Sequence, residues 1–202
     1  NATKAPWNDM RLIKALSLAT DRQEFIKAFG GGKYTIGAPF PTGSWYGSTQ
    51  DELLKRPGYR IPKDKDIEEA KALLKEAGYD PPSKLTNLVL LSPKLSDLPD
   101  WAQLWKAQLK RNLGLDLTIE AVDAPTGIAR HSQGDFSIGQ FGYGLNILDP
   151  DDYVGTIYGT GARNFSRWKN PDFLKMLEQQ SREQDLNKRR ALLRDMEEFL
   201  FT

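Results

Sequence analysis

The chain has no cysteine and only one histidine among its 202 residues. Without cysteine, neither a disulfide nor a thiolate metal site can form. A catalytic triad or a histidine-based metal site would depend on His131 alone, and no nucleophile or paired carboxylate surrounds this residue in the sequence. We therefore expect no catalytic residue, no metal and no cofactor.

Long apolar runs and an excess of one charge are also absent. No stretch of about 18 apolar residues occurs, so no transmembrane helix is expected. Lys and Arg number 28 and Asp and Glu 27, giving a net charge of +1, whereas nucleic-acid-binding domains usually have a basic excess. The polar start shows no signal peptide and the chain stops inside an apolar segment. We expect a piece of a longer protein, with residues 1–6 partly foreign to it.

Hydrophobic periodicity and capping residues predict the secondary structure. Asp21 with Glu24, and Asp66 with Glu69, resemble capping boxes at the starts of two helices. Strands are predicted at 85–91, 115–122 and 136–142, and helices at 9–20, 21–29, 66–77, 99–112, 125–132, 150–158, 171–182 and 187–201. The alternation predicts an α/β fold, a mixed βαβ sheet with flanking helices, in a single domain spanning 1–202.

Three of the five tryptophans bear on the choice between core and binding surface. Residues 33–65 are rich in glycine and proline and predict a long loop, in which Trp45 has less reason to join the core. We give equal weight to burial of Trp45 and to its contact with a ligand or a partner surface. Trp101 and Trp105 are four residues apart on one predicted helix, and we interpret both as core residues.

Residues 135–153 are the strongest candidate for a functional site. A glycine-rich strand leads into a polar, aromatic loop that carries Tyr143, Asn146 and Asp149. Asp149 is suited to cap the following helix, with Pro150 as its first residue. A strand that leads through such a loop to a helix N-terminus often forms part of a small-molecule site.

Several segments along the chain match one family pattern in the same order. They are APWNDMRLIKALSLATDR at 5–22, AKALLKEAGY at 70–79, WAQLWKAQLKRNLGLDL at 101–117, DFSIGQFGYGLNILDP at 135–150 and NFSRWKNPDFL at 164–174. Together they resemble the bacterial extracellular solute-binding proteins of family 5, the oligopeptide, dipeptide and nickel-binding group of ABC transporters.

The resemblance implies a periplasmic-binding-protein-like lobe, the second of two lobes that enclose the ligand. The expected partners are a small solute such as a peptide or oligosaccharide, the ABC permease subunits, and lobe I of the same parent protein, which is missing here. The implied location is periplasmic or extracellular, with attachment as a lipoprotein left open.

The resemblance also implies ligand-contacting residues. Tyr143 stands at the position of a family tryptophan, and Asn146 at that of an aspartate that holds the α-amino group of a bound peptide. An amide carries no charge, so Asn146 suits a neutral, hydroxyl-rich ligand such as an oligosaccharide, or a peptide held differently. Asp149 would supply the charge if the alignment shifts by a few residues. Gln140 and Arg130 lie where some members direct side chains toward the ligand.

Two other classes of function remain as alternatives. An α/β-hydrolase-like enzyme would need a Gly-x-Ser-x-Gly nucleophile elbow or a set of metal ligands, and the sequence has neither. A protein–protein interaction module that binds no solute would keep the fold. The prediction is a binding protein and not an enzyme.

Overall fold

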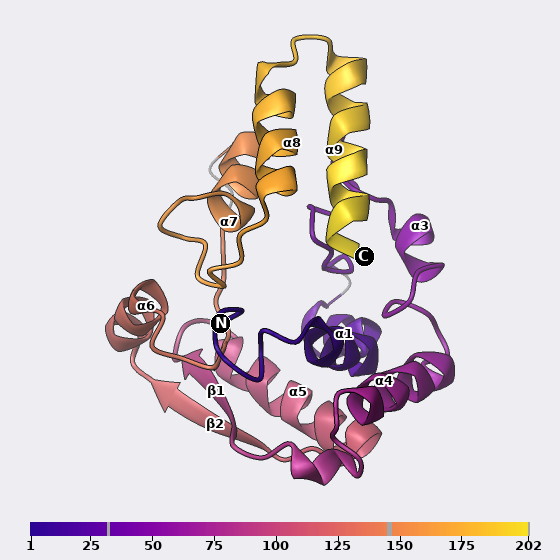
Figure 1. Cartoon of the computed structure of the whole chain (residues 1–202), viewed down its shortest axis with the longest axis vertical. Coiled ribbons are helices and arrows are strands. Elements are labelled where there is room, and N and C mark those ends of the chain that lie inside the picture. Colours follow the sequence, from indigo (N-terminus) through magenta and orange to yellow (C-terminus); the bar gives the residue numbers. More distant parts are fainter. Residues whose placement is uncertain (32, 145–146, 202) are drawn as a thin grey trace.

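The computed structural model describes residues 1–31, 33–144 and 147–201. A small sheet with packed helices forms one part of the molecule, and a helical hairpin extends from it (Figure 1). The helices are α1 Met10–Ala19, α2 Arg22–Phe29, α3 Gln50–Leu54, α4 Asp64–Glu76, α5 Leu98–Leu113, α6 Ala124–Gln133, α7 Thr156–Tyr158, α8 Pro171–Arg182 and α9 Leu186–Phe201, with a 3-10 turn at Pro82–Lys84 and a π-helical turn at Asp151–Gly155. Within the described residues, no helix is long and apolar enough to cross a membrane.

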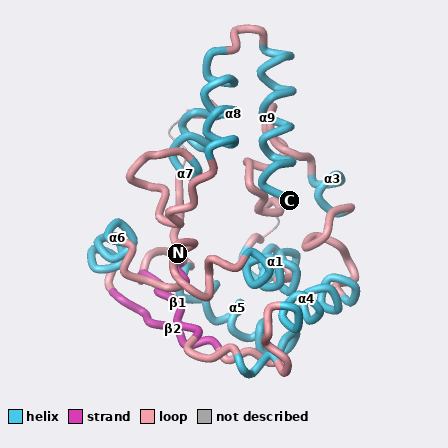
Figure 2. The backbone as a smooth tube through the Cα atoms, in the orientation of Figure 1, coloured by secondary structure: helices cyan, strands magenta, loops and turns pink. Residues whose placement is uncertain are grey.

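The sheet has the strand order β2-β1-β3, and both strand pairs are parallel. Its strands are β1 Leu88–Pro93, β2 Leu117–Val122 and β3 Ile138–Gly139, drawn in magenta in Figure 2. The central strand β1 is buried at all but one position, as expected for a parallel strand with neighbours on both edges. The predicted α/β class is confirmed.

The third strand is shorter than predicted. Pairing was expected over 136–142, but β3 comprises only Ile138 and Gly139, after which one more bond joins Gln140 N–H to the Leu91 carbonyl at 3.1 Å. Glycine lowers the tendency to form a strand, because its backbone loses more conformational entropy on folding and it has no side chain to pack. The chain therefore leaves the sheet early and forms the wall of a cavity.

Helices on the sheet form the largest of three hydrophobic cores in the described residues. α5 packs against β1 and β2, and α1 and α4 pack against α5 and each other. Their buried side chains include Leu12, Leu74 and Leu109. On the other side, α6 approaches β1 closely at Gly127, where an added Cβ would lie 2.6 Å from Cγ of Pro93. Only glycine permits this contact.

The C-terminal helices form a second core. α8 and α9 lie side by side (Figure 1) and enclose Phe173, Leu193 and Met196 together with Phe40 and Tyr46 from the long loop. The prediction of 171–182 for α8 is confirmed, and α9 begins one residue before the predicted start at 187. Residues far apart in sequence thus stabilise this hairpin.

Three local predictions are wrong. The predicted loop at 33–65 contains α3, and α4 begins at Asp64, so Asp66 does not cap a helix. Asp66 is fully buried and binds Lys63 and Arg60, because its position in the first turn of α4 faces inward. Asp21 does cap α2, but the carboxylate of Glu24 binds Gln108 and Arg111 and closes no capping box.

Candidate ligand-binding site

Two neighbouring cavities lie beside the first helices, and Arg22 lines both. The first, here called the aromatic cavity, has a volume of about 470 Å³, and its lining includes Arg22, Phe25, Lys33, Tyr34 and Trp101. The second, here called the sheet-edge cavity, has a volume of about 620 Å³. Volumes of this order suit small ligands.

The sheet-edge cavity runs alongside β3 and past its carboxyl end. Gly139, Phe141 and Tyr143 line the cavity, as do Leu16 of α1 and Thr20, the residue that follows α1. In open α/β sheets, ligands bind beyond the carboxyl ends of the strands. The structure therefore places part of the predicted segment 135–153 in a position suited to binding.

Tyr143 is held in place from several directions. Its hydroxyl donates to the carbonyl of Asp152 at 3.1 Å, and its ring meets that of Tyr153 edge-on at 6.0 Å. The guanidinium of Arg163, which also lines the cavity, lies 5.3 Å from the centre of the Tyr143 ring. Tyr143 therefore presents its ring as an apolar wall, while its hydroxyl is bonded within the protein.

Two of the predicted ligand residues have structural partners. The side-chain amide of Gln140 donates to the Leu98 carbonyl at 2.9 Å and thus connects the sheet to α5. Arg130 pairs with Glu120 at 2.6 Å and Asp135 at 3.0 Å. Gln140 and Arg130 are not among the described residues that line the aromatic cavity or the sheet-edge cavity. Their contact with a ligand stays a prediction.

The Asp149 carboxylate accepts from the Asp151 N–H at 2.9 Å, but the N-cap position of the π-helical turn Asp151–Gly155 is Pro150 and not the predicted Asp149. Burial alone would raise its pKa, but bonds from Arg189 at 3.0 and 3.1 Å outweigh this and hold the pKa of Asp149 below its usual value. Asp149 is therefore already charge-paired.

Trp45 packs edge-on against Tyr46, with the ring centres 5.3 Å apart. Asn146 lies outside the described residues.

His131 is buried in the wall of the sheet-edge cavity. Its Nδ1 lies 2.7 Å from the Gly127 carbonyl, which can only accept, so Nδ1 carries the hydrogen. Among the described residues, its Nε2 has no hydrogen-bond partner. The centres of the Phe136, Phe141 and Phe165 rings lie 4.8, 5.2 and 5.5 Å from the centre of the His131 ring. Burial lowers the pKa of His131, and the positive charge of Arg130 lowers it further.

This pKa predicts a pH dependence of stability. Below about pH 6.5, the unfolded chain binds a proton at His131 before the folded chain does, so the free energy of unfolding falls as the pH decreases. His131→Asn keeps an amide near the Gly127 carbonyl but removes the titration. We expect the variant to lose less stability than the wild type between about pH 7.5 and about pH 5.5, measured by urea denaturation. Equal losses would contradict the argument.

Sequence reasoning missed several residues of these cavities. Trp101 and Trp105 were interpreted as core residues. Trp105 does pack against the core of α1, α4 and α5, and its indole N–H donates to the Thr20 hydroxyl at 2.8 Å. Each of the two tryptophans also lines one cavity. Arg22 and Arg163 were not singled out. Helical spacing identified the inward face of α5 but gave no sign that part of it borders open space.

Comparison with known proteins places the chain in a family. The model described as "Bacterial extracellular solute-binding proteins, family 5 Middle" matches residues 1–165. The probable deoxycholate-binding periplasmic protein YgiS of Escherichia coli is 29% identical over 199 residues, covering 98% of this chain and 36% of that protein. The periplasmic oligopeptide-binding protein OppA of Salmonella typhimurium is 29% identical over 182 residues, covering 88% and 32%.

Solved structures agree with these matches. The murein tripeptide-binding protein MppA in its unliganded open form superimposes with a TM-score of 0.83 at 25% identity, covering 100% of this chain and 38% of that one. The chain thus spans well under half the length of the relatives that it matches. Relatives named periplasmic confirm the expected location outside the cytoplasm. The chain belongs to the bacterial extracellular solute-binding proteins of family 5.

Proposed function

We propose that this chain is lobe II of the substrate-binding component of an ABC importer. The observation that supports this most directly is the match to the family model over residues 1–165, in a fold with two cavities that share Arg22 in their lining. The chain covers 36% of the length of YgiS, in agreement with one lobe of a larger protein. Lobe I of the same parent is the expected second wall of the site.

The proposed mechanism is capture and release without catalysis. The solute binds against the cavities, lobe I closes over it around a hinge, and the closed form docks on the membrane permease. Closure buries the apolar surface of the solute and completes its polar contacts, which neither lobe does by itself. The protein releases the solute to the permease chemically unchanged.

The solute class stays broad at this level. The relatives include proteins named for binding oligopeptides, murein peptides, deoxycholate and heme. Similarity of sequence therefore identifies the binding role more closely than the ligand. We propose a peptide, an oligosaccharide or a related small solute.

A ligand screen on the full-length protein tests this function. We expect at least one solute from a panel of peptides, oligosaccharides and small organic acids to raise the melting temperature, because a ligand that binds the folded state stabilises it. Calorimetry should then give a dissociation constant at or below the micromolar range, and the solute should be recovered unchanged. Binding of no solute, or its conversion to a product, would contradict the proposal.

A further inference from the structure

Basic side chains line both cavities, and in the described residues no acidic side chain lines either one. Arg22 lines both, Lys33 lines the aromatic cavity, and Arg163 lines the sheet-edge cavity. Among the described residues, no Asp or Glu lines either one. The whole chain has 28 basic and 27 acidic residues, so this imbalance does not follow from composition.

Arg22 is the most firmly positioned of these cations. Its Nη1 donates to the carbonyls of Ser17 at 3.1 Å and Gly58 at 2.7 Å, and its Nη2 donates to the Ser17 hydroxyl at 2.9 Å. The guanidinium also lies 4.3 Å from the centre of the Tyr59 ring. All these partners are neutral, and Nε donates to no residue in the described ranges. The charge of Arg22 is held in place but is not neutralised.

Nearby acidic side chains are engaged elsewhere. The carboxylate of Glu24 lies 2.7 Å from Arg111, and that of Asp21 accepts two backbone N–H groups at the start of α2. No residue in the described part of the chain forms an ion pair with Arg22, Lys33 or Arg163.

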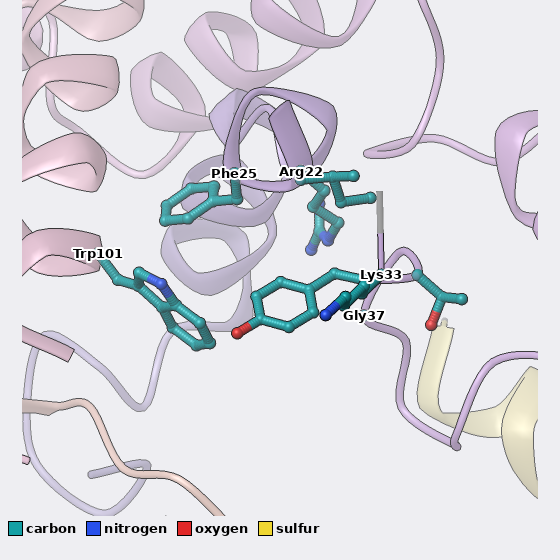
Figure 3. Close-up of a pocket in the computed structure, with 8 residues that line it drawn as sticks. Arg22, Phe25, Lys33, Gly37 and Trp101 are labelled. Carbon is teal, nitrogen blue, oxygen red and sulfur yellow. The ribbon is translucent and has the colours of Figure 1, made fainter. Parts of the chain in front are cut away.

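An aromatic wall faces these charges. Trp101 meets Tyr34 edge-on at 6.4 Å and lies 6.4 Å from Phe29. Figure 3 shows Phe25 and Trp101 on one side of the cavity and Arg22 and Lys33 on the other. The buried Nε1 of Trp101 has no hydrogen-bond partner among the described residues. The cavity therefore combines an apolar surface with an excess of hydrogen-bond donors and positive charge.

We propose that the solute is an amphipathic organic anion, with its carboxylate bound at Arg22 near Lys33 and its aromatic or alicyclic body against Trp101. This deepens the proposed function and rests on it. Charge-assisted hydrogen bonds from a guanidinium to a carboxylate are among the stronger polar contacts. A ligand ammonium would meet cations and no carboxylate here, which makes its desolvation costly.

A series of matched ligands tests this on the full-length protein. N-acetyl-Phe-Trp has one negative charge, N-acetyl-Phe-Trp-amide is neutral, and Phe-Trp-amide has one positive charge, while the aromatic body is shared. We expect calorimetry to show the anion binding at least about tenfold more tightly than the neutral amide, and the cation most weakly. Equal or tighter binding of the neutral or cationic peptide would overturn the inference and leave the proposed function standing.

Two matched variants locate the effect. Lys33 and Lys27 are both exposed, and only Lys33 lines the aromatic cavity. We expect Lys33→Met to weaken binding of the anion about two- to fivefold and Lys27→Met to leave it unchanged. Arg22→Met should abolish the preference for the anion over the neutral amide.

The outcomes separate the two proposals. Equal effects of Lys33→Met and Lys27→Met overturn the inference, and this pair decides the matter if Arg22→Met does not fold. Failure of the acetylated anion to bind also overturns it, even if the wider screen finds another solute. Only a screen in which no solute binds contradicts the proposed function itself.

Discussion

Replacing Asp66 with alanine should lower the free energy of unfolding by about 3–5 kcal/mol. The Asp66 side chain is fully buried, accepts from the Gly58 N–H at 3.0 Å and pairs with Lys63 at 2.6 Å and with Arg60. Burial already lowers the pKa of Lys63, and the carboxylate opposes that effect. Alanine would leave a largely buried ammonium without its counter-charge, which is the expensive part of the change.

Urea denaturation of the variant measures this loss, and Asp64→Ala serves as the matched control. Asp64 lies in the same first turn of α4 but is exposed, so its removal should cost only about 0.3–1 kcal/mol through the helix dipole. Asp66→Asn keeps one acceptor and should fall between the two. If Asp66→Ala and Asp64→Ala lose the same stability, the buried pairing does not stabilise the fold.

Asp66 also shows where prediction from the sequence stops. The pattern Asp66-Ile67-Glu68-Glu69 fits a helix start, and local spacing contains no sign that Arg60 and Lys63 lie close enough to bind the carboxylate. The helix was therefore predicted to begin at Asp66, whereas α4 begins at Asp64. By contrast, the bounds of α8 were predictable because Asn170 and Pro171 are local signals, and the Asn170 side chain does cap the helix.

One wall of the site was predictable from the sequence, and the rest of the site was not. Glycines and aromatic residues in 135–153 indicated a binding wall, and Phe141 and Tyr143 do line the sheet-edge cavity. The opposite wall comes from α1, and the charged end comes from Arg22, more than a hundred residues earlier in the chain. Which side chains face one cavity depends on how helices pack, and one sequence contains no direct record of that packing.

Phe173→Ala should also cost about 3–5 kcal/mol, since it opens a cavity in the second core. Phe173 is fully buried, and its ring lies 5.3 Å from Trp168, 5.9 Å from Tyr158 and 5.9 Å from Phe199. It therefore joins α8 to α9 and to the segment before α8. The three neighbouring rings cannot fill the space left by the Phe173 ring unless the helices shift.

The effect of Phe173 should appear in urea denaturation of the variant, with Lys175→Ala on the exposed side of α8 as a control that changes stability by less than about 0.5 kcal/mol. Phe173→Leu should lose less than the alanine variant because it keeps more of the buried volume. Arg189 of α9 binds Asp149, which follows the loop of Tyr143. Loosening α8 and α9 should therefore also weaken solute binding, whereas an unchanged affinity in Phe173→Ala would show that the hairpin does not support the binding wall.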